Sequence, residues 1–149
     1  MKLLFIISLL LSGSFSADNL FVRDKVKINF DKTFPNANDV VWVKQDNNNV
    51  KAVLIQDDIK THITYNPDGT VNQCLRYYAC KHLPAHIRAR VYEKFPDSEI
   101  IGVTEAFSDN ALNYYINIKS SAKIYELRSD PSGDIVKLKS FKDGSLAGE

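Results

Sequence analysis

The feature that most constrains this chain is an internal repeat. An apolar pattern that ends in Phe-Pro occurs twice at a constant offset of 61 residues, as Val26, Phe30 and Phe34-Pro35 and as Ile87, Val91 and Phe95-Pro96. An Asx-Pro-x-Gly turn then follows in each copy at an offset of 64 residues, as Asn66-Pro67-Asp68-Gly69 and as Asp130-Pro131-Ser132-Gly133. Two ordered matches indicate a duplication, so the fold must be one that two similar halves can build.

Each copy opens with a helix-like stripe of apolar residues. In the first copy the stripe from Val22 to Phe34 has four-residue spacing, and Asp18 or Asn19 is a plausible cap at its start. In the second copy Pro84 suits the first helical turn, and Pro96 follows the end. Neither helix can bury its stripe alone, so we expect each one to lie on a sheet.

Four strand-like segments follow each helix, and short polar turns separate them. The predicted strands are residues 40–45, 50–56, 60–65 and 71–79 in the first copy, and 100–106, 112–119, 123–128 and 135–141 in the second. Apolar and polar residues alternate along 112–119, which indicates one covered face and one wet face. A helix followed by an antiparallel meander, twice, predicts an α+β fold.

The first residues are typical of a secretory signal peptide. Lys2 precedes the apolar run Leu3–Leu11, and small residues follow, which favours cleavage after Ser16. The run is too short to span a bilayer as a helix, although an N-terminal anchor is the alternative. We therefore predict an exported protein, periplasmic or secreted. The predicted organisation is a signal peptide at 1–16, one domain at 17–141 with repeats at about 20–80 and 84–141, and a flexible tail at 142–149.

The charge balance excludes one large class of partner. The chain has 19 Lys and Arg against 18 Asp and Glu, and removal of the signal peptide with Lys2 leaves 18 of each. Nucleic-acid binding needs clustered basic residues that neutralise phosphates, so we expect no nucleic-acid partner. A mature protein without net charge is expected to find a partner by shape and aromatic contact, with little long-range steering.

The two cysteines are predicted to be free thiols. Cys74 and Cys80 lie six residues apart in a segment that is predicted to be extended. Their α-carbons would then be about 20 Å apart, whereas a disulfide requires about 4.4–6.8 Å.

Several of these segments resemble one known family. The residues that carry the resemblance are Phe34-Pro35, Val40-x-Trp42, Asn66-Pro67-Asp68-Gly69, Leu83-Pro84 and Phe95-Pro96. They are similar to the β-lactamase-inhibitor-like, PepSY-like proteins exported by Bacteroidetes-type bacteria, over about Val22–Phe141. The resemblance implies one sheet of about eight strands with both helices on one face. It implies no catalytic residue set.

The residues themselves also give no catalytic constellation. His82 and His86 have the spacing of two ligands on one helix face, but residues 83–85 lack the Glu of a metalloprotease motif. We interpret them as solvated histidines near the start of the second helix, and His62 as unrelated to them. The sequence therefore predicts a protein that is not an enzyme and needs no cofactor.

The Asp-rich turns allow a second reading. Asn66 and Asp68 in the first copy, and Asp130 and Asp134 in the second, offer hard oxygen ligands beside a glycine. Calcium is the metal that such ligands would take. Ordinary hairpin turns explain the same residues, and both readings stay open at this point.

The aromatic residues suggest a binding face. If Val71, Leu75 and Tyr77 meet the helices, then Arg76 and Tyr78 face solvent on the opposite side of the sheet. By the same alternation Tyr115 faces solvent in the second copy. Tyrosine provides a large contact area with one polar group, so Arg76, Tyr78 and Tyr115 are the predicted partner-binding residues. Trp42, by contrast, is expected in the core.

Two functional hypotheses follow. The first is an exported, non-enzymatic binding protein that inhibits or regulates an envelope enzyme such as a protease through the solvent face of its sheet. The alternative is a calcium- or small-ligand-responsive sensor of the periplasm that is built on the Asp-rich turns.

Overall fold

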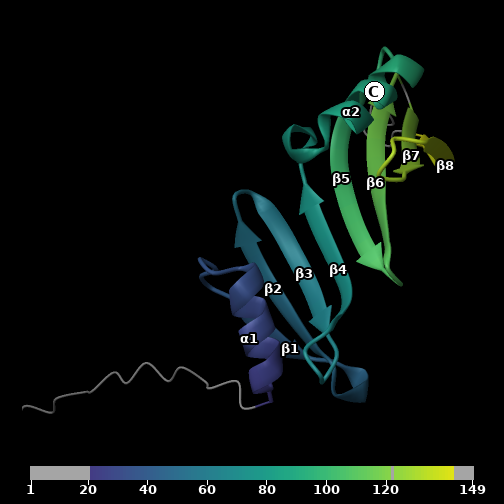
Figure 1. Cartoon of the computed structure of the whole chain (residues 1–149). Coiled ribbons are helices and arrows are strands. Elements are labelled where there is room, and N and C mark those ends of the chain that lie inside the picture. The colour runs from purple at the N-terminus through teal and green to yellow at the C-terminus, as the bar shows by residue number, and fades with distance from the viewer. Residues whose placement is uncertain (1–20, 122, 143–149) are drawn as a thin grey trace, which may run out of the picture.

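Both copies of the repeat contribute to one antiparallel sheet (Figure 1). The computed structural model describes residues 21–121 and 123–142. The elements are α1 (Asp24–Thr33), β1 (Val41–Lys44), β2 (Val50–Gln56), β3 (Ile59–Tyr65), β4 (Val71–Tyr78), α2 (Ala85–Lys94), β5 (Glu99–Ser108), β6 (Ala111–Ser120), β7 (Lys123–Ser129) and β8 (Ile135–Lys142). The eight strands lie in chain order, so the predicted α+β fold is confirmed. The predicted signal peptide at 1–16, and residues 143–149 of the predicted tail, lie outside the described residues.

The first core lies between α1 and the first strands. Val26 and Phe30 of α1 are buried against residues of β2 and β3. The ring of Trp42 lies 5.1 Å from that of Phe30, centroid to centroid, in an edge-on arrangement. Trp42 therefore packs against this core, as the sequence predicted. Figure 1 shows α1 over the β1 to β3 half of the sheet and α2 over the second half.

The start of α1 corrects one expectation. The apolar stripe predicted a helix from about Asp18 or Asn19, but α1 begins at Asp24 because Arg23 has an extended backbone (φ −69°, ψ 149°). Val22 is nevertheless only 5% exposed. It joins the core from the irregular segment before the helix, which is why the spacing of the stripe extended the predicted helix too far. Asp24 in the first turn suits the positive end of the helix dipole.

The second core repeats the first. Ile87 and Val91 of α2 are fully buried against Ile116, Ile118 and Leu127. The bounds of α2 are those of α1 displaced by 61 residues. Both helices also end in the same way, because the backbone N–H groups of the two Phe residues of the Phe-Pro pairs donate to the helix carbonyls four residues earlier, each at 2.8 Å. The duplication is therefore visible in the geometry as well as in the sequence.

The Asx-Pro-x-Gly turns fasten each helix to its sheet. Gly69 and Gly133 both have φ of +90°, a conformation that glycine adopts without steric cost. The Asn29 side chain of α1 donates to the Gly69 carbonyl at 2.6 Å. In the second repeat, Nε2 of His86 lies 2.9 Å from the Pro131 carbonyl. His86 is thus exposed near the start of α2, as predicted, but it also bonds the helix to the β7–β8 turn.

One buried hydroxyl leads to a stability prediction. Tyr65 is 0% exposed in the first core, and its hydroxyl has no hydrogen-bond partner among the described residues. Burial raises the pKa of Tyr65 to about 12 from an ordinary value of 10.0. Replacing Tyr65 with Phe should therefore raise the free energy of unfolding by up to about 1 kcal/mol, because it removes an unsatisfied polar group.

The same substitution should change the pH dependence of stability. A tyrosine whose pKa is raised by folding contributes its full stability below its unfolded pKa, and this is lost as pH rises through the folded value. Urea unfolding from pH 7 to 12 should therefore show a smaller alkaline loss for Tyr65→Phe than for the wild type. A lower stability of the variant at pH 7 would show that the hydroxyl has a partner.

Candidate binding surface

Strand pairing decides which side chains share a face of the sheet. On β4, Cys74 pairs with Ile63 of β3, which is buried beneath α1, and Tyr78 pairs with Val103, which belongs to the core beneath α2. Because alternate residues of a strand share a face, Arg76 faces the helices with Cys74 and Tyr78.

The predicted placement of Arg76 and Tyr78 is therefore wrong. Apolar side chains occur on both faces of β4, so alternation alone could not orient this strand. The structure puts Leu75 and Tyr77 on the helix-free face and buries Tyr78, which is 7% exposed. A phenol can be buried here because a carboxylate accepts a hydrogen bond from its hydroxyl group.

That carboxylate is Glu105 on the neighbouring strand β5. The Tyr78 hydroxyl donates to Oε2 of Glu105 at 2.8 Å, and Nη1 of Arg76 lies 2.9 Å from Oε1. The Arg76 guanidinium also lies 5.8 Å from the centre of the Tyr78 ring. Burial, and then the hydrogen bond to Glu105, raise the pKa of Tyr78 above its ordinary range. Arg76 and Tyr78 thus form a structural network on the helix side of the sheet.

Tyr115 lies where the sequence predicted it. It pairs with Thr104 of β5, and Thr104 pairs on its other side with Tyr77 of β4. The two tyrosines therefore flank one small residue on the helix-free face, and both are half-buried. The alternation along β4 predicts Tyr77 on the covered face, so the sequence does not identify it as a binding residue.

His62 extends this aromatic group onto β3. Its ring lies 5.2 Å from that of Tyr77 in an edge-on arrangement, and it pairs with Leu75. Its Nε2 atom is buried and has no hydrogen-bond partner among the described residues. Burial, followed by the charges of Lys60 and Lys51, lowers the pKa of His62. A neutral imidazole is therefore expected at pH 7. We call His62, Leu75, Tyr77 and Tyr115 the aromatic centre of the helix-free face.

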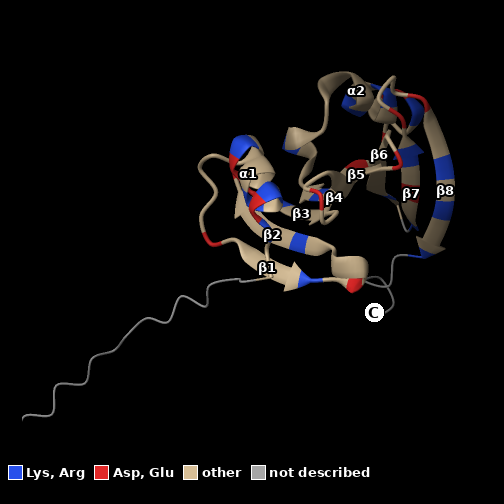
Figure 2. Ribbon diagram, turned by 60° about the horizontal axis from the view of Figure 1, so that its bottom comes forward, with Lys and Arg blue, Asp and Glu red and all other residues tan. Residues whose placement is uncertain are grey.

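Charge is unevenly distributed around the aromatic centre. Register places these basic side chains on the helix-free face: Lys51, Lys60, Lys119, Arg128 and Lys139. The strands place only Glu99 and Glu126 there as acidic side chains. Figure 2 shows blue segments along β8 and on β2. Although the chain as a whole has almost equal numbers of basic and acidic residues, the helix-free face has an excess of basic side chains. Such a face favours a partner with an acidic surface.

The predicted calcium ligands lie in two different turns. Oδ1 of Asp68 accepts hydrogen bonds from the backbone and the hydroxyl of Thr70, at 2.9 and 2.6 Å. Oδ1 of Asp130 accepts from Ser132 in the same way and also from the Asp134 backbone at 3.0 Å. These bonds lower the pKa of both carboxyls. Within the described residues no cluster of three metal-ligating acidic, His or Cys side chains occurs.

Calcium binding at these turns remains a prediction. Asn66 is also engaged, since its amide donates to the Thr70 hydroxyl at 3.0 Å. If the carboxylates serve only the turns, the melting temperature should be the same in calcium and in chelator. A calcium-dependent rise that is lost in the double variant Asp130→Asn, Asp134→Asn would instead support the sensor hypothesis.

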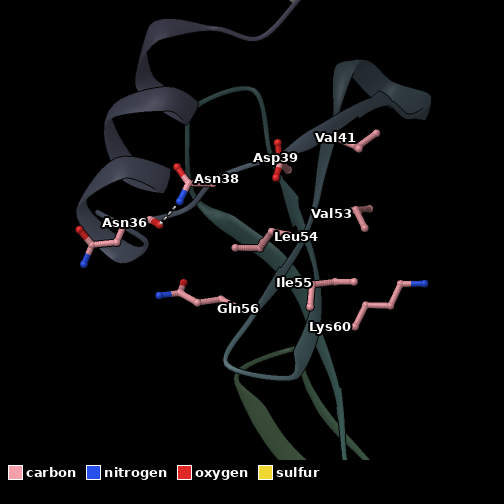
Figure 3. A pocket seen from close by; sticks show the side chains of 9 residues that line it. All are labelled: Asn36, Asn38, Asp39, Val41, Val53, Leu54, Ile55, Gln56 and Lys60. Atoms are coloured by element: carbon pink, nitrogen blue, oxygen red, sulfur yellow. Dashed lines mark hydrogen bonds between the residues drawn. The ribbon is translucent and has the colours of Figure 1, made fainter.

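A cavity of about 390 Å³ lies at the outer edge of β2 (Figure 3). Val41, Val53 and Ile55 line one side of it, and the segment between α1 and β1 lines another. Val41 is 58% and Ile55 is 70% exposed. The sequence did not reveal this cavity. The cavity lies where β2 continues past the last residue that pairs with β1, and Asp39, which has φ of 54°, is among the residues that line it.

The cysteines are free thiols, as predicted. Cys74 packs against the first core and Cys80 against the second. Burial raises the pKa of the Cys74 thiol, so its thiolate form is disfavoured.

Several solved structures superpose on this chain over most of its length, although their sequence identity to it is low. A BLIP-like protein from Bacteroides fragilis superposes with a TM-score of 0.62 at 14% identity, over 82% of this chain and 88% of that one. The chain has a β-lactamase-inhibitor-like fold. A candidate periplasmic protein from Bacteroides eggerthii superposes with a TM-score of 0.58 at 19% identity, over 81% of this chain and 88% of that one. A DUF2874 family protein from Bacteroides ovatus superposes with a TM-score of 0.57 at 19% identity, over 80% of this chain and 86% of that one.

At the level of the fold, these structures confirm the resemblance to β-lactamase-inhibitor-like proteins of Bacteroidetes-type bacteria. No family model matches the sequence, and no curated protein matches it. None of the helices within residues 21–121 and 123–142 is long and apolar enough to cross a membrane.

Proposed function

We propose that this chain is an exported, non-enzymatic protein that binds another protein of the cell envelope through the helix-free face of its sheet. The observation that carries the proposal is the aromatic centre, which lies on central strands with no described segment packed over it. Protein-binding sites commonly have aromatic side chains such as tyrosine at their centre and charged side chains around them.

Rigidity supports this proposal. The helix-free face is formed by a continuous eight-stranded sheet, and both helices stabilise that sheet from the other side. A face that is already formed before binding loses little conformational entropy in a complex. We propose that the consequence is steric: the face covers a cleft of an envelope enzyme, such as a protease, and thereby inhibits or regulates it without chemistry.

The double variant Tyr77→Ala, Tyr115→Ala tests this proposal. Removing both rings should reduce recovery of the partner from an envelope extract at least tenfold, because truncating each central aromatic anchor typically costs more than 1 kcal/mol of binding free energy. The matched control is Tyr92→Ala, since Tyr92 is 38% exposed on α2 and lies on the other side of the molecule. Equal recovery by both variants would reject the helix-free face as the binding surface.

A further inference from the structure

The outer edge of β2 has unpaired backbone groups. Strand β1 pairs with Val50 to Val53 only, so β2 extends past it to Gln56. The connection between β1 and β2 shows which backbone groups of β2 face β1. There the Gln45 N–H donates to the Asn49 carbonyl at 2.9 Å, so Gln45 and Asn49 are a hydrogen-bonded pair. In an antiparallel pair the hydrogen-bonded residues alternate, so Lys51, Val53 and Ile55 direct their N–H and C=O groups toward β1.

Ile55 is the outward-facing residue that β1 does not reach. The register that joins Val41 to Val53 would place Asp39 opposite Ile55. Asp39 instead has φ of 54°, and β1 and its pairing with β2 begin only at Val41. No described backbone group bonds to Ile55 on this side. The cavity of about 390 Å³ lies beside this gap.

The second repeat shows what such a gap accepts. Trp42 pairs with Ala52 in the first repeat, and Val103 pairs with Ile116 in the second, so Ile55 corresponds to Lys119. Opposite Lys119 lies Glu99, and beside it Ile100 pairs with Ile118 and is 6% exposed. The place that is open next to Ile55 is thus filled in the second repeat by an extended acidic-apolar segment.

We propose that the open edge at Ile55 binds a short extended segment of a partner protein, in which an acidic residue precedes a β-branched apolar residue. The segment adds to the sheet as a strand and exchanges two backbone hydrogen bonds with Ile55. Its acidic side chain lies on the helix-free face, where Ile55 pairs with Lys60. The apolar side chain that follows lies on the helix side of the sheet, beside Leu54, which corresponds to Ile118 and lines the cavity. This inference rests on the proposed function for its class of partner.

The probe is a capped peptide with the sequence of residues 97–104, Asp-Ser-Glu-Ile-Ile-Gly-Val-Thr. Titrated into the ¹⁵N-labelled protein, it should slow hydrogen exchange of the Ile55 amide, which is otherwise fast. The variant Ile55→Pro lacks the outward N–H and should bind at least tenfold more weakly, whereas Ile55→Thr keeps the N–H and should retain binding. Proline is tolerated at a sheet edge, and the circular dichroism spectrum verifies that Ile55→Pro is folded.

Two further variants sharpen the test. The quadruple variant Asn38→Glu, Asp39→Ile, Val40→Ile, Val41→Gly copies residues 99–102 of the second repeat, where a register shift brings Glu99 opposite Lys119, and it should protect the Ile55 amide and exclude the peptide. Lys60→Glu should weaken binding of the peptide, because it removes the positive charge that faces the acidic residue of the peptide. A peptide with Lys in place of its Glu should bind that variant more tightly than the original peptide does.

An unchanged Ile55 amide would overturn the inference, and so would equal binding to the Pro and Thr variants. Dimerisation that protects Ile55 without peptide would also overturn it, by placing a second copy at the edge. The peptide should still bind the double variant Tyr77→Ala, Tyr115→Ala. The experiment therefore distinguishes an error in the proposed peptide site at Ile55 from an error in the proposed binding surface on the helix-free face.

Discussion

Replacing Tyr78 with Ala is expected to lower the free energy of unfolding by about 3–5 kcal/mol, which is the range for removing a large aromatic side chain from a core. Tyr78 is 7% exposed and packs in the second core, so its loss leaves a cavity. It also removes the hydroxyl that donates to Glu105 at 2.8 Å. Urea unfolding at pH 7 measures the effect.

Two control variants separate the parts of this effect. Tyr78→Phe keeps the ring and loses only the hydrogen bond, so we expect a loss of about 1 kcal/mol. Tyr115→Ala removes a tyrosine from the helix-free face, where no helix packs, and should cost less than about 1 kcal/mol. Similar losses for Tyr78→Ala and Tyr115→Ala would contradict the assignment of faces on β4.

Replacing Gly69 with Ala is expected to cost about 3 kcal/mol or more of stability, because two penalties add. The first is the φ of +90°, which costs an L-residue roughly 1–2 kcal/mol. The second is a collision, because a Cβ at this position would lie 2.8 Å from the backbone oxygen of Lys25 in α1. That oxygen belongs to the helix and cannot move without shifting α1.

The second repeat supplies a matched control at Gly133. This glycine has the same φ of +90°, but a Cβ there would lie 3.5 Å from the nearest atom, a side-chain carbon of Arg90. Gly133→Ala should therefore cost only the conformational penalty of about 1–2 kcal/mol. Thermal or urea unfolding of both variants measures the difference. A Gly133 variant as unstable as the Gly69 variant would show that φ alone governs both turns.

The repeat explains why so much of the fold was predictable. Apolar residues at helical spacing, a Phe-Pro end and an Asx-Pro-x-Gly turn are local signals, and each occurs twice. The predicted strands agree with the observed ones to within about two residues at their ends, as for residues 50–56, which form β2. The start of α1 was missed because Val22 continues the apolar spacing while its backbone is not helical.

The binding face was harder to predict than the fold. On β4, Cys74 and Tyr78 face the helices and Leu75 and Tyr77 do not, and both sets are apolar enough to be buried. Which set is buried depends on Glu105, a residue 27 positions away that accepts a hydrogen bond from the Tyr78 hydroxyl group. Such a pairing has no local signal. The open edge at Ile55 likewise has no local signal, because β1 begins only at Val41 and Asp39 before it has a positive φ, a conformation that Asp can adopt but that its presence does not require.

Site-specific photocrosslinking in the cell envelope tests the central claim most directly. A photoreactive benzoylphenylalanine replaces Tyr115 on the helix-free face in one variant and Tyr92 on α2 in another. We expect the residue at 115 to form a covalent adduct with one envelope protein, in a yield that falls at least tenfold when Tyr77→Ala is also present, and the residue at 92 to form none. Adducts from position 92 but not from position 115 would show that the partner binds the helix side, which would contradict the account.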